Sequence, residues 1–423
     1  MDKEHYLAAK EVVAILQSHN FIAYFNGGWV RDFLMNHPSN DIDIVTNAPL
    51  TAIQQLFSKI IPVGISFGIL IVIHKEYQFE VAIFRKESDY RDGRRPVYID
   101  TATPQEDAQR RDFTINGMFY DPIHHKLYDY VNGQGDISKK IIRAIGDPAL
   151  RFKEDRLRMI RAARYAVRFD FTIEFNTLRA IKNEAKYLFP SVAIERVWNE
   201  LQKMSSVPNF SKGLILLYEL GLLTVIFPDL QSLTLSQLKN NLRHLPKFPK
   251  ETPLVIKILE LFPQYSLDQK IALCNYLKTS KQDKSLARFW HKSERLLSLI
   301  PLEKKDWYFF VEFYAHPHSS LLLQIMKTKL DQSDQSTFEK EHASLQKKLA
   351  SAIERKKRGI FLLTGAALLH QGIPPGRHVK ALLNEGEYLS IIHGLQTPAA
   401  VFKQLQQSNV WKNYIIRINS TKN

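Results

Sequence analysis

The pattern of hydrophobic residues changes near Lys139, and this change constrains the fold more than any other feature of the chain. Before it, short β-rich runs alternate with helical patterns, and Gly, Asn, Asp and Pro cluster between them. After it, the strand signals fade and long helical patterns follow one another. The sequence therefore predicts an α+β protein with a small α/β domain at the N-terminus and an all-helical remainder.

Periodicity predicts the individual elements. Tyr6–His19 is expected to form an amphipathic helix. The expected strands are Asp41–Val45, Gly68–His74, Phe79–Phe84 and Leu127–Val131. The clearest later helices are Arg151–Phe169, Ser191–Met204, Gly213–Leu223 and Leu254–Leu261, and residues 362–383 are expected to form a helix, a turn and a helix.

Charge and cysteine content narrow the class of protein. The 423 residues include 58 Lys and Arg against 43 Asp and Glu, a net charge of +15 that favours a nucleic-acid partner. The single cysteine, Cys274, excludes a disulfide framework, a disulfide-linked partner and a zinc cluster of cysteines. Residues 213–227 are too few and, with Glu219, too polar to span a bilayer, and the charged start does not resemble a signal peptide. We expect a soluble cytoplasmic protein without membrane association.

Two adjacent glycines, Gly27 and Gly28, lie between an apolar run and a helix-compatible run. Glycines at such a place allow a tight turn and a close approach of the backbone to a ligand. The amides at the start of the following helix suit a phosphate group. By itself such a pair more often marks an ordinary turn.

Two acids, Asp41 and Asp43, follow closely. In a strand, residues two apart project to the same face, so both carboxylates point together while Ile42 and Ile44 fill the opposite face. Adjacent carboxylates repel one another unless a divalent cation lies between them, and Mg²⁺ takes one or two carboxylates together with phosphate oxygens. The sequence predicts a Mg²⁺ site at Asp41 and Asp43. Glu80, on the face of its strand opposite Phe79 and Val81, is either a third acid of this site or a surface glutamate.

The sequence GGWVRD at residues 27–32, followed by DIDI at 41–44, resembles the signature of the class II tRNA nucleotidyltransferase and bacterial poly(A) polymerase family, which belongs to the polymerase-β-like nucleotidyltransferases. Further blocks follow in the order of that family. Residues 110–116 (RRDFTIN) resemble its ribose-recognition block, 129–136 the block that joins head to neck, 154–158 (EDRLR) the base-recognition block, and 193–197 the helical block after it. The resemblance is specific over roughly residues 20–205.

This resemblance implies an organisation and a reaction. It implies a polymerase-β-like nucleotidyltransferase head over residues 1–138, a helical neck that recognises the base over 139–240, and an RNA-binding body and tail over 241–423. It implies template-independent nucleotidyl transfer to an RNA 3′ end, in which Asp41 and Asp43, with Glu80, serve catalysis and hold two Mg²⁺ ions. The nucleotide-binding residues are expected to be Gly27, Gly28, Arg31, Arg111, Asp112, Asn116, Asp155, Arg158 and Arg161.

Side-chain chemistry gives several of these residues a role. Arg110 and Arg111 offer guanidinium forks to a triphosphate, and Asp112 and Asn116 can hydrogen-bond a ribose hydroxyl; the alternative is a structural cluster of ion pairs.

Side-chain chemistry also gives a role to Asp155 and Arg158 of the base-recognition block. Asp155 and Arg158 are three apart, which places them on one face of the expected helix. There, an acceptor beside donors matches the edges of cytosine and adenine but not those of guanine and uracil. The alternative is a plain salt bridge between the two, and we expect the side chains to hold each other in position before the base arrives.

Two stretches bear on the choice of product. The polar stretch Arg85–Asp107 is expected to be a long functional loop. Members of the resembled family that add only C lack part of this loop. Here it has its full length, with Arg91, Asp92, Arg94 and Arg95, so the resemblance implies an enzyme able to add A. In the family that this chain resembles, bacterial poly(A) polymerases carry a Gly-Arg-Arg-Phe-like stretch after the catalytic Asp pair. Residues 62–68, at the corresponding place, lack these arginines. We therefore expect an enzyme that adds CCA to tRNA from CTP and ATP. The alternatives are a poly(A) polymerase or A-adding enzyme, and an RNA-binding protein with a degenerate head.

Overall fold

The computed structural model describes residues 3–37, 39, 41–62, 68–90, 96–297 and 303–420. The chain forms two compact units. The first comprises Met1–Pro246 with Asn275–Lys278, and the second comprises Lys247–Cys274 with Thr279–Asn423. The domain boundaries expected after residues 138 and 240 stay predictions.

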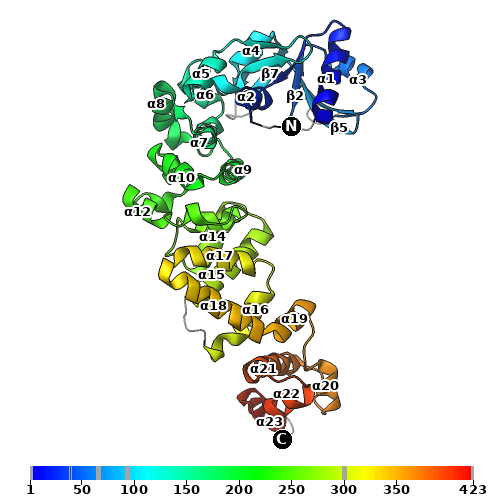
Figure 1. The fold of residues 1–423 in the computed structure, drawn as a ribbon, viewed down its shortest axis with the longest axis vertical. Helices are drawn as coiled ribbons and strands as arrows, with labels where there is room; N and C mark the ends of the chain where they lie inside the picture. Colours follow the sequence, from blue (N-terminus) through cyan, green and yellow to red (C-terminus); the bar gives the residue numbers. More distant parts are fainter. Residues whose placement is uncertain are drawn as a thin grey trace. The chain divides into compact units, whose positions relative to one another are not determined.

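The first unit begins with a seven-stranded sheet in the order β3-β4-β5-β2-β1-β8-β9 (Figure 1). Its strands are β1 (Ala23–Asn26), β2 (Asp43–Thr46), β3 (Ile60–Ile61), β4 (Ile69–His74), β5 (Tyr77–Ile83), β8 (Met118–Asp121) and β9 (Lys126–Asp129). Neighbouring strands are antiparallel except β2 and β5, which pair in parallel with Ile44 opposite Val81.

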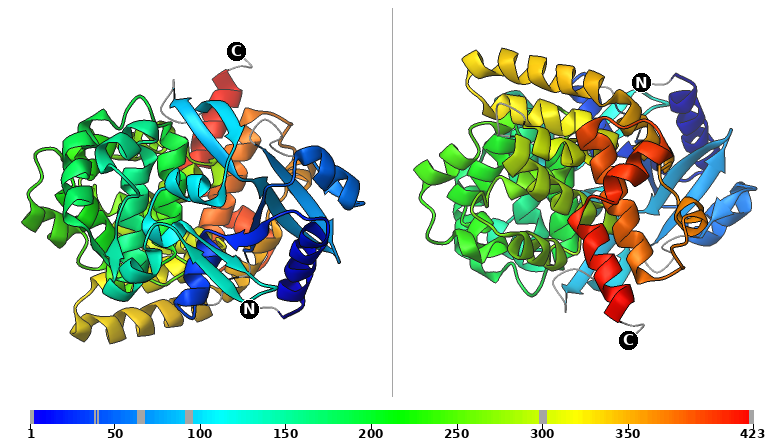
Figure 2. Two further views of the ribbon diagram at one scale, coloured as in Figure 1. Left: turned by 90° about the horizontal axis from the view of Figure 1, so that it is seen from above. Right: turned by 90° about the horizontal axis from the view of Figure 1, so that it is seen from below.

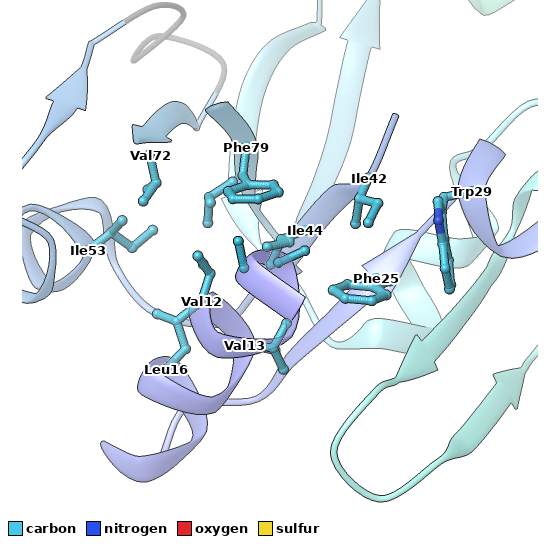
Figure 3. Close-up of a cluster of buried hydrophobic side chains, with 14 of the residues drawn as sticks. Val12, Val13, Leu16, Phe25, Trp29, Ile42, Ile44, Ile53, Val72 and Phe79 are labelled. Atoms are coloured by element: carbon cyan, nitrogen blue, oxygen red, sulfur yellow. The ribbon is translucent and has the colours of Figure 1, made fainter. Parts of the chain in front are cut away.

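One face of this sheet packs against α1 (Lys3–Ser18), α2 (Gly28–Leu34) and α3 (Leu50–Leu56). Figure 3 shows Val12, Val13 and Leu16 of α1 directed toward Ile44 and Phe79 of the sheet. Because strand residues alternate between faces, Asn26, Asp43 and Glu80 project from the opposite face. The apolar core therefore determines which side of the sheet carries the polar groups.

Most of the elements expected in this domain are present. The helix expected over Tyr6–His19 is α1, and the four expected strands correspond to β2, β4, β5 and β9 with ends displaced by one or two residues. Asp41, however, precedes β2. Strands β1 and β8 are four residues long and buried at every position, so they show no alternation by which to predict them.

The expectation of a long loop over Arg85–Asp107 is wrong. β6 (Arg85–Tyr90) and β7 (Pro96–Thr101) form an antiparallel hairpin, and α4 (Pro104–Gln109) follows it. Thr103 caps the N-terminus of α4 with a capping box: its hydroxyl accepts from the Glu106 amide, and the Glu106 carboxylate accepts from the Thr103 amide. Arg91, Asp92, Arg94, Arg95 and residues 63–67 lie outside the described residues.

The helix expected over Arg151–Phe169 consists of two helices. α6 (Pro148–Glu154) is followed by Asp155, whose backbone is extended, and α7 (Leu157–Phe169) begins two residues after Asp155. Nearby, β10 (Ile141–Ile142) pairs in parallel with β11 (Thr172–Ile173). Among the described residues after 138, this pairing and an isolated bridge from Ala144 to Phe113 are the exceptions to the expected all-helical structure. Further helices of the first unit follow: α8 (Phe175–Glu184), α9 (Ile194–Ser205), α10 (Phe210–Glu219), α11 (Leu222–Ile226) and α12 (Leu235–Asn241).

The described residues of the second unit form helices without strands (Figure 2, yellow-green to red). The expected helix, turn and helix over residues 362–383 is confirmed as α20 (Gly365–His370) and α21 (Arg377–His393). The sole cysteine, Cys274, is buried. Among the described residues, no helix combines the length and the apolar character needed to cross a membrane.

Candidate active site

A pocket of about 670 Å³ lies in the first unit, between the strand ends of the sheet and helix α7. The predicted residues that line it are Gly27, Gly28, Arg31, Asp41, Asp43, Arg111, Asp112, Asn116, Asp155, Arg158 and Arg161. Eleven of the twelve predicted site residues thus surround one space, although they come from segments more than 130 residues apart. Glu80 is not among the lining residues.

The acidic part of the pocket is formed by Asp41 and Asp43. Asp43 is the first residue of β2, and Ile42 and Ile44 on either side of it are buried in the core, as predicted. Asp41 lies before the strand and is exposed. Both carboxylates therefore face the pocket while the isoleucines anchor the segment that carries them.

Glu80 lies next to Asp43 across the parallel pairing of β2 and β5. Burial raises the pKa of Asp43 to about 7, and the negative charges of Glu80 and Asp41 add to this shift, whereas Arg111 opposes it. Asp43 is thus a buried carboxyl group with two further acids beside it. A divalent cation bound there would offset the negative charge of these acids.

The described residues contain no group of three or more His, Cys, Asp or Glu side chains placed to hold a metal by themselves. A cation bound at Asp41 and Asp43 would therefore need further oxygen ligands from a substrate, which is how Mg²⁺ is commonly bound.

The glycine pair turns the chain from β1 into α2. Gly27 has φ +64°, a conformation that favours glycine, and a Cβ atom there would lie 3.3 Å from an Arg111 nitrogen. Gly28 begins α2 and lies beside the Arg31 guanidinium. The backbone can therefore come close to the arginine side chains of the pocket wall.

Arg31 is held firmly: its side chain is 3% exposed, and it pairs with Asp32 at 2.7 Å. It also donates to the Asn116 side-chain oxygen at 2.5 Å and lies over the rings of Tyr165 and Phe169. Most of its hydrogen-bonding capacity is therefore used within the protein, and only its edge lines the pocket.

Asp112 is also engaged in the structure. Its carboxylate accepts from the Phe113 amide, from Asn116 at 2.9 Å and from Arg161 at 2.6–2.8 Å. Burial by itself would raise the pKa of Asp112, but the charge of Arg161 and these hydrogen bonds lower it to about 2. Asp112 therefore stays ionised and joins the head to α7.

The predicted mutual contact between Asp155 and Arg158 is wrong. Asp155 lies between α6 and α7 rather than on one helix with Arg158. Arg158 pairs with Glu154 at 2.6 Å, and Asp155 pairs with Arg196 of α9 at 2.8 Å. Both side chains still line the pocket, each held by its own partner.

Sequence reasoning missed several lining residues. These include Asn26, Asp32, Arg164, Arg168, Arg196 and Lys203. Arg158, Arg161, Arg164 and Arg168 recur at spacings of three and four, which places them on one face of α7, and this signal could have identified the last two. Asn26 and Lys203 carry no such signal.

Basic residues dominate the lining of the pocket. Its residues include eight arginines and one lysine but only five carboxylates. Buried acids behind or within the wall pair with these cations, and Glu200, for example, binds Arg164 at 2.6 Å. The pocket therefore combines a small acidic corner with a large, fixed cationic surface, which suits a bound polyphosphate and a metal ion.

Comparisons with known proteins extend these observations. The family described as the poly A polymerase head domain matches residues 23–143. The family described as the probable RNA and SrmB-binding site of polymerase A matches residues 170–233.

Three curated relatives, each named a CCA-adding enzyme, illustrate the similarity in sequence. A CCA-adding enzyme of Oceanobacillus iheyensis is 31% identical over 420 residues, which cover 96% of this chain and 98% of that protein. A CCA-adding enzyme of Staphylococcus haemolyticus is 36% identical over 69% of this chain and 70% of that protein. A third, from Staphylococcus saprophyticus, is 45% identical over about half of each chain (48% and 51%).

Solved structures share the fold. The Bacillus stearothermophilus CCA-adding enzyme in complex with CTP matches with a TM-score of 0.77 and 23% identity over 99% of this chain and 100% of that one. The Thermotoga maritima CCA-adding enzyme complexed with tRNA-CCA matches with a TM-score of 0.66 and 19% identity over 96% of each chain. The expected α+β fold is confirmed.

The raised pKa of Asp43 predicts a dependence of stability on pH. Because its pKa rises from 3.8 in the unfolded chain to about 7 in the folded protein, the folded state binds this proton more tightly. Stability from this group is therefore present at low pH and lost as the pH rises through about 7. Without divalent ions, Asp43→Asn should raise the thermal midpoint relative to the native protein by more at pH 8 than at pH 5. An equal difference at both pH values would show that Asp43 titrates normally.

Proposed function

The chain belongs to the CCA-adding enzyme family of tRNA nucleotidyltransferases, and on this premise we propose that it adds C, C and A to the 3′ end of tRNA from CTP and ATP without a nucleic-acid template. The observation that best supports the proposal is the single pocket lined by Asp41, Asp43, Arg111, Asp155 and Arg158. An acidic corner for chemistry, cations for a triphosphate and polar groups for a base edge thus share one space. We also propose the cytoplasm as the compartment, because the proposed substrate is tRNA.

Nucleotidyltransferases of this kind use a divalent metal ion, and we propose Mg²⁺ held by Asp41 and Asp43, with Glu80 adding negative charge beside them. The raised pKa of Asp43, caused by burial and then by Glu80 and Asp41, fits a site that favours a bound cation. In the proposed two-metal scheme, the ions supply the positive charge that activates the primer 3′-hydroxyl and neutralises the departing pyrophosphate. Glu80 acts through its charge, since it does not line the pocket.

The protein's own cations would bind and orient the triphosphate. Arg111 and Arg110 line the pocket from the head, and Arg164 and Arg168 line it from α7. Because ion pairs already fix most of these guanidinium groups, little reorganisation is needed when the nucleotide binds. The Gly27 turn leaves room for the phosphates beside Arg111.

The base would be read by Asp155 and Arg158. Asp155 accepts from the exocyclic amino group of cytosine or adenine, and Arg158 donates to the neighbouring ring nitrogen. Guanine and uracil present donor and acceptor in the opposite order. The pairs with Arg196 and Glu154 orient both side chains before the base arrives, which replaces the direct contact expected from the sequence.

The helical second unit would bind the RNA backbone. It carries basic clusters such as Arg355–Arg358 at the end of α19 (Ala350–Arg358) and Arg377 and Lys380 at the start of α21. Phosphate contacts of this type are electrostatic, so the affinity for tRNA should fall steeply with salt.

The test of the function is a product analysis. Purified protein is incubated with tRNA that lacks CCA and with CTP and ATP, singly and together, and the products are sequenced. With both nucleotides the products should end at C-C-A, and with CTP alone at C-C. Long A tails on tRNA and generic RNA, without C incorporation, would instead support the poly(A) polymerase alternative. Absence of any incorporation would support the RNA-binding alternative.

Removal of either catalytic acid should abolish incorporation. Asp41→Ala and Asp43→Ala should each reduce the rate about a hundredfold or more, because a metal ligand is lost, while tRNA binding stays close to that of the native protein. Glu219→Ala removes an exposed acid of α10 and serves as the control. Activity above a few per cent in both aspartate variants would contradict their catalytic role.

Loss of the base-reading groups should relax selectivity. Asp155→Ala or Arg158→Ala should raise UTP and GTP incorporation relative to CTP and ATP by about tenfold, the value of one lost base-edge contact. Arg156→Ala is a matched control, since Arg156 is a neighbouring arginine that pairs with Glu184 and does not line the pocket. An unchanged nucleotide preference in both variants would show that the two side chains serve only structure.

A further inference from the structure

Asp107 is a fully buried acid directly behind the wall of the pocket. It lies on α4, three and four residues before Arg110 and Arg111, and its side chain is 0% exposed. Both arginines line the pocket, whereas Asp107 does not. A buried acid at this place cannot contact a bound nucleotide, so its effect on the site must pass through its neighbours.

Each oxygen of the Asp107 carboxylate holds one of the two arginines. Oδ1 accepts from Arg110 at 2.7–2.9 Å and from the Arg85 amide at 3.2 Å. Oδ2 accepts from the Nε and Nη2 atoms of Arg111 at 3.0 and 2.7 Å. The carboxylate thus separates two guanidinium groups that are adjacent in sequence and would otherwise repel one another.

This arrangement fixes the direction of Arg111. Of its five N–H groups, one on Nε and one on Nη2 bind Asp107, and one on Nη1 binds Asn26 at 2.9 Å. The guanidinium also lies over the Phe119 ring, 5.1 Å from its centre. The other two N–H groups have no partner among the described residues, and Arg111 lines the pocket. Burial by itself would raise the pKa of Asp107, but the charges of Arg111 and Arg110 lower it, so the Asp107 carboxylate stays negatively charged at neutral pH.

We infer that Asp107 is a positioning residue for the triphosphate: it orients Arg110 and Arg111 in the wall of the pocket. The inference rests on the proposed function, because it assumes that these arginines bind a nucleoside triphosphate. Its consequence is that Asp107 governs the affinity for the nucleotide rather than the rate of transfer from bound nucleotide.

The same domain offers a matched control. Asp136 is also buried, and it accepts from the Thr114 hydroxyl at 2.7 Å and from Arg143 at 3.0 Å. Arg143 does not line the pocket. Loss of the Asp136 carboxylate therefore removes an ion pair made by a buried acid without changing the partner of any arginine that lines the pocket.

The test compares Asp107→Asn with Asp136→Asn in the full-length protein. Asp107→Asn should raise the Kd for CTP, measured by calorimetry, and the KM for CTP and ATP by about tenfold or more, with kcat changed much less. Asp136→Asn should lower the thermal midpoint but leave Kd and KM close to native values. Equal losses of affinity in both variants, or an unchanged Kd in Asp107→Asn, would overturn the inference.

A double variant tests whether Asp107 acts through Arg111. In an Arg111→Gln background, Asp107→Asn should lower the CTP affinity by less than it does in the native background, because one of the two positioned groups is already gone. Full additivity would contradict the positioning role, even if Asp107→Asn also lowers the thermal midpoint. Absence of C and A incorporation by the native protein would count against the proposed function, while the comparison of CTP affinities would still decide the role of Asp107.

Discussion

The arrangement of the pocket depends on acids that each hold two arginines. The three sets are Asp32 with Arg31 and Arg168, Asp107 with Arg110 and Arg111, and Glu200 with Arg161 and Arg164. In every set one carboxylate holds two guanidinium groups, which fixes the direction of both, and Arg161 is held by Asp112 as well. A surface built in this way can receive a polyanion with little loss of side-chain freedom.

These ion pairs also connect parts of the first unit that are distant in sequence. Asp112 of the head binds Arg161 of α7, and Asp32 of the head binds Arg168 near the end of the same helix. Asp43 of the acidic corner is placed differently, by the alternation of β2 over an apolar core, and Asp41 precedes that strand. Strand periodicity thus orients Asp43, whereas ion pairs orient the cations: local ones hold Arg110 and Arg111, and long-range ones hold Arg161 and Arg168.

This difference explains what could be predicted. The orientation of Asp43 follows from its buried neighbours Ile42 and Ile44, a local pattern visible in the sequence. The break at Asp155 was missed because residues three apart look alike within one helix and across a helix end. Its partner, Arg196, lies 41 residues away. The resemblance pointed to the segment around Arg196 but not to the contact, and the partners of buried charges generally depend on tertiary packing that local periodicity does not encode.

The central claim is that one pocket holds the triphosphate beside Asp41 and Asp43 while Asp155 and Arg158 read the base. A crystal structure of this protein with CTP and a divalent ion tests it most directly. The account predicts that the cytosine edge contacts Asp155 and Arg158, that the triphosphate lies against Arg111, and that the ion contacts Asp41 and Asp43. A nucleotide bound elsewhere, or bound here with its base directed away from Asp155 and Arg158, would contradict it.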